Sequence, residues 1–297
     1  MKVNGNKAKG LRRVILLALT LCFAIPFTCD GSTKITLSLE KKEYLLDEAL
    51  FYEVEVKAMG DKPSYFQWIS ESPALEVRDA ENRLLPTFNL HIEFSYPIQK
   101  IVRRKGNTTI QAEKLLSGES SYIIAGSPVE LQRETFKIGR YKVRYPILEY
   151  DEENGQFKKA YSDWWEFDVV APSGAEAQID SLLHISKQKE PRTHLRKMLE
   201  KYPKSIYAGT ILWHLSGYDQ QEEMLIKFID RHTETMGASY GIWLLMTHWV
   251  GFDYDKLAEG KETRIKIELL AAKYKGTKVE EAIRKQLAML ERSAKER

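Results

Sequence analysis

The stretch APSGAEAQ (residues 171–178) divides the chain into two parts whose apolar residues recur with different periods. Before it, KITLSLE (34–40) and LFYEVEVKA (50–58) alternate apolar and polar residues, as half-buried β-strands do. After it, the apolar residues recur with the period of an α-helix. Pro172 and Gly174 are typical of a break between two such parts. The chain is therefore predicted to be a β domain followed by an α-helical domain.

Turn signals separate the expected strands of the first part. LEVRDAENRLLP (75–86) is predicted to be strand, turn and strand, with the turn at Asp79–Asn82. Asn154-Gly155 separates two further strand-like runs, and this pair is favoured in tight hairpins. Seven or more short strands with turns between them favour an antiparallel β-sandwich, which we place at residues 32–171.

The second part, residues 172–297, contains a repeated sequence pattern. KMLEKYPKSIYAGTILWHL (197–215) aligns without gaps to KFIDRHTETMGASYGIWLL (227–245), and LLAAKYKGTKVEEAIRKQL (269–287) is a weaker third copy. Each copy contains a helix end, an aromatic turn, a Ser or Thr N-cap and a new helix. The expected helices span residues 175–188, 191–202, 205–216, 220–232, 235–249, 257–274 and 277–293.

Two segments of the first part resemble bacterial, extracytoplasmic Ig-like β-sandwich modules. KKEYLLDEALFYEVEV (41–56) looks like their opening pattern, with Asp47 where those modules usually have Gly. FKIGRYKVRY (136–145) looks like their late Gly-x-Tyr strand entry, with Gly139 in a turn and Tyr141 as a corner tyrosine. The resemblance implies an Ig-like sandwich and carries no function.

The first helical joint resembles another family. LEKYPKSIYA (199–208) looks like the Leu-x-x-Tyr-Pro-x-Ser-x-x-Ala joint of tetratricopeptide-like repeats in bacterial envelope proteins. The second copy lacks the Pro, and the third lacks the Ala. This resemblance implies an array of helix pairs that binds a protein partner.

The N-terminus has the pattern of a secretory signal peptide. Five basic residues precede a mostly apolar run at Val14–Thr28, which is shorter than a membrane-spanning helix. Small residues at −3 and −1, Cys29 and Gly31, favour cleavage after Gly31, so that residues 1–31 are removed. The protein is then expected to be periplasmic, at the cell surface or extracellular.

Other fates of this segment stay open. Cleavage after Ala24 also satisfies the small-residue rule, with Cys22 at −3. Lipidation of Cys29, or a signal that stays uncleaved, would instead attach the protein to a membrane. Pro26, Phe27 and Thr28 before Cys29 match the lipoprotein pattern poorly, so cleavage without lipidation is preferred.

Removal of the signal changes the charge balance. The whole chain has 45 Lys and Arg and 42 Asp and Glu, a net charge of +3. Residues 1–31 contain five basic side chains and one acid, which leaves 40 basic and 41 acidic side chains, a net charge of −1. A nearly neutral protein has no field that would attract nucleic acid, so we expect none as a partner.

Signals for catalysis, metals and cofactors are weak. No two of the six histidines are three or four residues apart, so no helix face offers a paired metal site. The acidic run EYDEENG (149–155) fits no calcium loop and is interpreted as a solvated hairpin tip. SGESSY (117–122) lacks the second Gly of a nucleophile elbow. We predict no catalytic residue, no metal and no cofactor.

Two adjacent tryptophans fall in a predicted strand. Trp164 and Trp165 point to opposite faces there, so one is expected in the core. We expect the helical domain to cover the other, although a carbohydrate-binding surface is an alternative. Trp213 and Trp243 occupy equivalent repeat positions and are expected between helices.

The composition and repeats favour a non-enzymatic exported protein that binds a protein partner in the groove of its helical array. Candidate groove residues are those that the repeat pattern leaves unexplained. The alternatives are a hydrolase of envelope glycans or peptides, with carboxylates at the domain junction, and a glycan-binding protein. The predicted partner-binding residues are Tyr207, Thr210, His214 and Tyr240.

Overall fold

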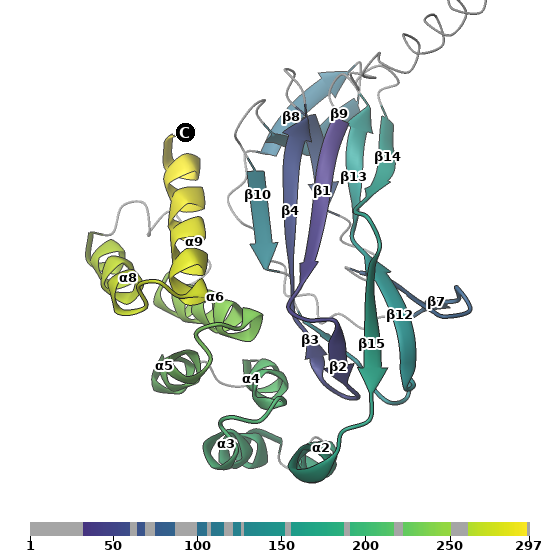
Figure 1. Cartoon of the computed structure of the whole chain (residues 1–297). Coiled ribbons are helices and arrows are strands. Elements are labelled where there is room, and N and C mark those ends of the chain that lie inside the picture. The colour runs from purple at the N-terminus through teal and green to yellow at the C-terminus, as the bar shows by residue number, and fades with distance from the viewer. Residues whose placement is uncertain are drawn as a thin grey trace, which may run out of the picture.

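The computed structural model has a β-rich part followed by a helical part (Figure 1). The last strand ends at Val170 and the first helix of the second part begins at Gly174, which agrees with the change of period at 171–178. We refer to residues 32–170 as the β region and residues 174–295 as the helical region. The structure describes residues 32–59, 64–68, 75–86, 100–105, 108–115, 121–125, 128–151, 156–186, 191–216, 222–250 and 261–295.

Several sequence predictions lie outside these residues. The signal segment with its cleavage sites is one, and the tip of the 149–155 run, including Asn154-Gly155, is another. None of the described helices is both long enough and apolar enough to cross a membrane.

Three sheets and one two-stranded ladder form the described β region. All strand pairs are antiparallel except β15 with β2, which run parallel. The first sheet contains, in spatial order, β1 (Ser32–Leu39), β4 (Tyr52–Met59) and β10 (Ser121–Ala125). The two-stranded ladder pairs β11 (Val129–Glu130) with β3 (Ala49–Leu50). The second sheet is β2 (Glu43–Leu45), β15 (Trp165–Val170), β12 (Gly139–Arg144), β6 (Glu76–Asp79) and β7 (Leu84–Leu85). The third is β14 (Gln156–Tyr161), β13 (Pro146–Asp151), β5 (Ser64–Trp68), β9 (Thr108–Leu115) and β8 (Lys100–Lys105).

Period-two alternation places one face of these strands in the core. In β4, Tyr52, Val54 and Val56 are buried, whereas Glu53 and Glu55 are only half-buried. Because consecutive side chains point to opposite faces, this is the arrangement that the alternating sequence predicts.

Two predicted turns of the β region have the expected geometry. Asn82 has a φ of 66°, and its N–H donates to the Asp79 carbonyl at 3.0 Å. Asp47 has a φ of 63°, a left-handed conformation that glycine adopts more easily than a residue with a side chain.

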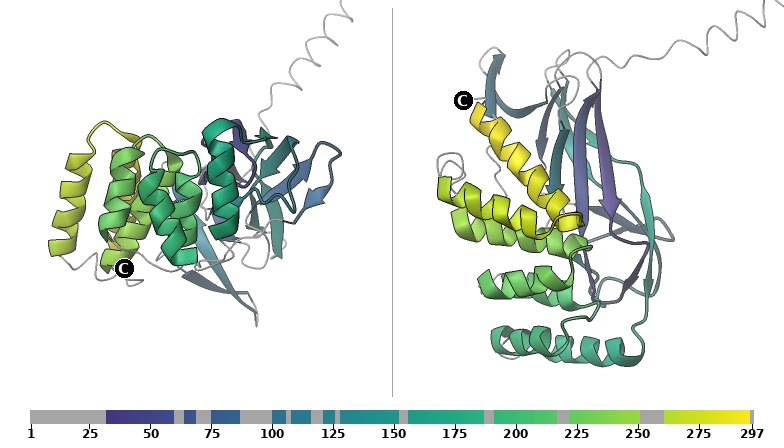
Figure 2. Two further views of the ribbon diagram at one scale, coloured as in Figure 1. Left: turned by 90° about the horizontal axis from the view of Figure 1, so that it is seen from below. Right: turned by 60° about the vertical axis from the view of Figure 1, so that its left-hand side comes forward.

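Seven helices form the described helical region, at nearly the predicted positions. They stack beside the β region, and α4, α6 and α9 lie on the side nearer to it (Figures 1 and 2). The helices are α2 (Gly174–Ser186), α3 (Pro191–Lys201), α4 (Ala208–Ser216), α5 (Glu222–Arg231), α6 (Met236–Val250), α8 (Lys261–Lys273) and α9 (Lys278–Lys295).

The three repeated joints share one hydrogen-bonding pattern. Ser205, Thr235 and Thr277 each accept a hydrogen bond from a backbone N–H two or three residues later, as N-cap residues do. The prediction that these residues start the second helix of each pair is therefore confirmed, although α4 itself begins only at Ala208. Trp213 and Trp243 are buried between helices, as predicted.

Tyr141 closes a loop of the β region as the expected corner tyrosine. Its hydroxyl donates to the Lys137 carbonyl and accepts from the Lys137 N–H, both at 2.8 Å, and the residue is 6% exposed. Its ring stacks on Phe167 at 5.7 Å and contacts Phe136 at 5.3 Å.

Replacement of Tyr141 by Phe keeps the ring contacts and removes both hydrogen bonds. We expect the free energy of unfolding to fall by about 1–2 kcal/mol, because the Lys137 backbone groups lose their partner. Urea unfolding measures this as a lower midpoint with an unchanged slope. Tyr161→Phe, at a residue that is 37% exposed, is the control. An equal midpoint for both variants would contradict the assigned role.

Candidate functional site

The turn between β2 and β3 docks onto α4. The Tyr207 hydroxyl donates to the Leu46 carbonyl at 2.7 Å, and the Ala49 N–H donates to Thr210 Oγ1 at 2.8 Å. Tyr207 and Thr210 are 0% and 1% exposed. These two bonds satisfy backbone groups of the β region with buried side chains of the helical region.

Phe51 fills the space next to this turn. It belongs to the hydrophobic core of the helical region although it follows β3 directly. A Cβ atom on Gly209 would lie 2.9 Å from the Phe51 ring, so only glycine at 209 allows this approach. The Phe51 ring also contacts Tyr240, with centroids 5.8 Å apart. Burial of Phe51 stabilises the junction by about 2–3 kcal/mol.

Polar side-chain contacts also join the two regions. Arg133 donates through Nε to Asp47 at 2.6 Å and through a terminal nitrogen to Asp180 of α2 at 2.7 Å. His214 Nε2 lies 3.1 Å from Glu130 Oε1. Burial raises the pKa of Asp180, and the Arg133 guanidinium opposes that shift.

The four predicted partner-binding residues therefore come together at one surface, but the β region covers it. Tyr207 and Thr210 bond to the β2–β3 turn, Tyr240 contacts Phe51, and His214 pairs with Glu130. Tyr207 and Tyr240 also belong to the hydrophobic core of the helical region. Tyr207, Thr210 and Tyr240 are at most 1% exposed, so a separate partner has little access to them in this conformation. Binding of a partner by the four residues stays a prediction.

A cavity of about 240 Å³ lies beside the junction, and we call it the junction cavity. Glu40, Lys41 and Glu48 of the β region line it together with His232 and Lys204 of the helical region. Glu40 accepts from the Met236 N–H, at the start of α6, at 3.2 Å. Sequence reasoning did not select either glutamate as a site residue, although Glu48 lies in the Ig-like opening pattern at 41–56 and Glu40 in the strand-like run at 34–40.

Burial raises the pKa of both glutamates in this cavity. The pKa of Glu48 rises to about 7, although Lys41 Nζ at 2.7 Å and the Leu45 N–H at 2.8 Å favour the carboxylate. The pKa of Glu40 is raised by burial against the opposing effect of its bond to Met236. Burial lowers the pKa of His232, whose Nε2 lies 2.7 Å from the Pro203 carbonyl oxygen.

Trp164 and Trp165 have different surroundings. Trp165 packs partly against the core of the β region, as predicted for one of the pair. Trp164 lies under Arg144 at 4.4 Å and Lys142 at 4.8 Å, measured to the ring centroid. Cations of β12 thus cover Trp164, and the expectation that the helical region does so is wrong. Such cover also leaves less of the ring for stacking on a sugar.

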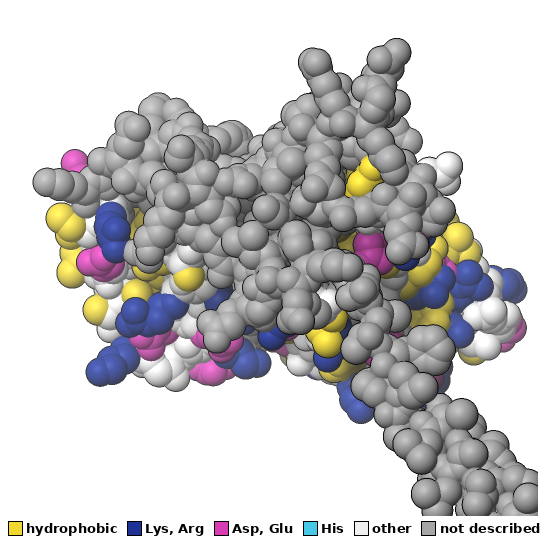
Figure 3. Space-filling model, turned by 90° about the horizontal axis from the view of Figure 1, so that it is seen from above, with side chains coloured by type: hydrophobic (Ala, Val, Ile, Leu, Met, Phe, Trp, Pro, Cys, Tyr) yellow, Lys and Arg dark blue, Asp and Glu magenta, His cyan; other side chains and the backbone are white. Residues whose placement is uncertain are grey.

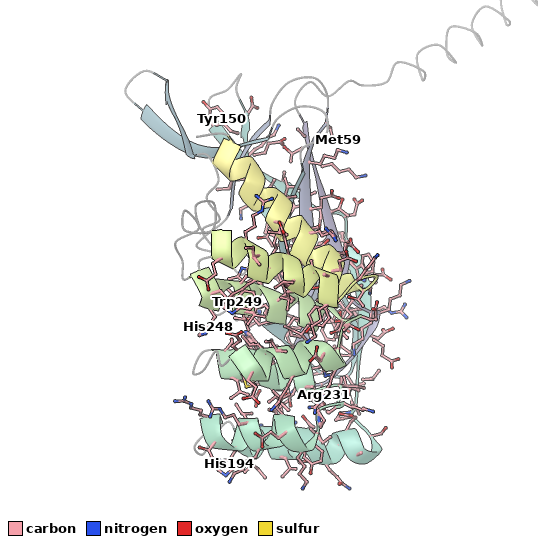
Figure 4. The ribbon with its side chains drawn as sticks, turned by 90° about the vertical axis from the view of Figure 1, so that its left-hand side faces the viewer. Met59, Tyr150, His194, Arg231, His248 and Trp249 are labelled. Carbon is pink, nitrogen blue, oxygen red and sulfur yellow. The ribbon has the colours of Figure 1, made fainter. Side chains whose placement is uncertain are left out.

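A second hollow lies on the far side of the helical region, between α3 and α5. Its volume is about 150 Å³, and we call it the outer groove. Leu199, Met224 and Phe228 form its floor, and Glu200, Lys227 and Arg231 stand at its rim. Figure 4 faces this side of the helical region, with His194 on α3 and Arg231 on α5 labelled.

The first helix of each pair contributes to this free side, and we call α3, α5 and α8 the first-helix row. At its far end α8 exposes two aliphatic side chains, Ile265 at 56% and Leu269 at 66%. Seen from above, hydrophobic, basic and acidic side chains are interspersed along the outer side of the helical region (Figure 3). The described residues contain no group of three or more His, Cys, Asp or Glu that could hold a metal ion.

Comparisons with known proteins do not identify a family. No protein-family model and no curated protein matches the chain. A CARDB domain from Pyrococcus furiosus is similar over 48% of this chain and 96% of its own, with 14% identity and a TM-score of 0.23. A β-glucosidase from Listeria innocua is similar over 47% of this chain and 16% of its own, with 16% identity and a TM-score of 0.24. TM-scores of this size carry no inference about function.

The raised pKa of Glu48 predicts a pH-dependent stability. A group whose pKa rises from 4.5 to about 7 on folding stabilises the fold below pH 4.5, and this contribution is lost as pH rises to 7. We expect it to amount to about 3 kcal/mol at most. The difference in unfolding free energy between the wild type and Glu48→Gln should therefore change between pH 4.5 and 7.5. Glu166→Gln, at an exposed position, is the matched control, and a difference that does not change with pH for Glu48→Gln would refute the assignment.

Proposed function

We propose that the protein is an exported, non-catalytic binding protein that recruits a protein partner through the first-helix row. The β region is an Ig-like sandwich in this proposal, and the helical region is a tetratricopeptide-like array. The basic and apolar pattern of residues 2–28 supports export. The proposal places the protein in the bacterial periplasm or at the cell surface.

The proposal rests on the face of the helical region that the β region does not cover. The β region occupies the face that contains Tyr207, Thr210 and Tyr240, so that face already has a partner within the chain. The opposite face keeps the outer groove, with an apolar floor and a charged rim. An apolar floor supplies affinity when it is desolvated, and a charged rim sets orientation and encounter rate.

Site-specific photocrosslinking in the cell envelope tests this proposal. A benzoylphenylalanine at Lys197, Lys227 or Lys266 lies on the first-helix row, and one at Lys159 lies on β14 of the β region. We expect the same protein to be captured from the row and not from Lys159. Failure of all three row positions to capture a protein would reject the proposal.

A second candidate is hydrolysis of an envelope glycan or peptide at the junction cavity. Two carboxyl groups with raised pKa values, Glu40 and Glu48, line one cavity, and a general acid requires such a shift. Both groups also have structural partners, Lys41 for Glu48 and the Met236 N–H for Glu40. These partners favour the binding function over catalysis.

Incubation of the purified protein with peptidoglycan tests the second candidate. On the hydrolase hypothesis, the wild type releases soluble fragments, Glu48→Gln loses this activity, and Glu166→Gln retains it. Mass spectrometry of the supernatant identifies the fragments. We expect no fragments from any of the three proteins, and release by the wild type would favour the hydrolase.

A further inference from the structure

The helix α8 exposes apolar side chains where the other helices of the first-helix row are polar. Ile265 is 56% exposed and Leu269 is 66% exposed. In the repeat alignment, extended by one helical turn toward the N-terminus, the equivalent residues are Thr193 and Lys197 in α3 and Glu223 and Lys227 in α5. In α5 the two form an ion pair at 2.7 Å. The repeat therefore does not require apolar residues here, and their presence on α8 favours contact with another molecule.

A hollow of about 470 Å³ adjoins these side chains, between α8 and α9, and we call it the end groove. Its apolar lining consists of Ala271 and Ala272 of α8 and Leu287 and Ala288 of α9. Ala272 lies three residues after Leu269, so the two share one side of the helix. The exposed pair and the end groove thus form one continuous surface on the last helix pair.

The positions equivalent to this groove are buried in the two earlier helix pairs, which further helices follow. Leu287 is equivalent to Leu215 in α4 and Leu245 in α6, and both of these are 0% exposed. In α9, by contrast, Leu287 is only partly buried. Among the described residues no helix pair follows α9. The end groove is therefore the surface on which one more helix of the array would pack.

The helix α2, at the other end of the array, also has an exposed apolar side. Leu182 is 40% exposed and Ile185 is 58% exposed, whereas Ile179 and Leu183 lie in the core of the helical region. None of the exposed residues of α2 is charged. In Figures 1 and 2, α2 and α3 lie at the end of the stack that is far from α8 and α9. Terminal repeats of such arrays usually have a polar outer face, and both ends depart from this rule.

The charges beside the end groove are already paired within the chain. Arg264 pairs with Glu268 at 3.0 Å, and Arg284 pairs with Glu280 at 2.6 Å. The groove therefore does not select a charged occupant. The exposed side of α2 is uncharged as well, so the two ends match each other in chemistry.

We infer that the two ends bind each other, so that the exposed side of α2 in one copy packs into the end groove and against Ile265 and Leu269 of a second copy. The helix stack then continues from one molecule into the next. Two different surfaces meet in such a contact, so each pair of molecules keeps one free end of each kind and further copies can add. This inference goes beyond the proposed function, which does not require a second copy.

Sedimentation velocity of residues 32–297 tests the inference. A contact of this small size is weak, so we expect the average sedimentation coefficient to rise between about 2 and 200 µM protein. The double variant Ile265→Glu, Leu269→Lys, which we call the α8 variant, gives α8 the residue types of α5 and should stay monomeric. Leu182→Gln, Ile185→Gln, the α2 variant, should also stay monomeric. Ile138→Gln, at a residue of the β region that is 64% exposed, is the control and should associate as the wild type does.

A mixture of the two double variants identifies which surfaces meet. The α8 variant keeps an intact α2 side, and the α2 variant keeps an intact end groove. An equal mixture should therefore form dimers of one molecule of each, and nothing larger, although each variant alone is monomeric. Thermal unfolding checks that both variants keep the fold, and the single variants Leu269→Lys and Ile185→Gln replace any double variant that does not.

Each contrary result would overturn the inference. A wild type that stays monomeric at about 200 µM would show that the two ends do not bind each other at the expected strength. Association of either double variant alone would show that a surface pairs with itself or that other residues join the copies. A mixture that stays monomeric, or loss of association in Ile138→Gln, would also reject a contact between α2 and the end groove. None of these results depends on the crosslinks that test the proposed function.

Discussion

The docking of the β2–β3 turn onto α4 is the contact on which the arrangement of the two regions depends. Leu46 and Ala49 use their backbone groups to bond Tyr207 and Thr210, and Phe51 enters the helical core beside Gly209. A buried carbonyl or N–H without a partner would cost about 1–3 kcal/mol, so separation of the regions without water entry is unfavourable. The β region therefore covers one face of the helical region.

Because the β region covers this face, only the other faces of the helical region are available to a partner. Helical arrays often use one extended face to bind a partner, but here the row of α4, α6 and α9 lies next to the β region (Figure 1). Burial of charge at the junction follows from the same packing. Glu48, Asp180 and Glu40 lie at the junction, where burial disfavours the charged carboxylate. Burial therefore raises the pKa of each of these side chains. The free row, by contrast, keeps its charges in solvent, where they can act on another molecule at longer range.

The sequence predicted the helices and strands well, because the interactions that define them lie between residues that are close in sequence. The period change at 171–178, the capping residues Ser205, Thr235 and Thr277 and the corner Tyr141 all act through neighbours in sequence or one turn away. The same patterns selected Tyr207, Thr210, His214 and Tyr240 as residues that the repeat does not explain. What covers them was not predictable, since Leu46, Phe51 and Glu130 come from more than 80 residues away in the chain. A sequence period assigns a residue to a face and leaves the identity of the opposing surface open.

The candidate sites also contain residues that sequence patterns did not select and that only the fold brings together. Only the fold brings Glu40 and Glu48 into one cavity with His232. The outer groove arises from α3 and α5 of different repeats, yet the charge of α3 was readable in its eleven residues, PRTHLRKMLEK.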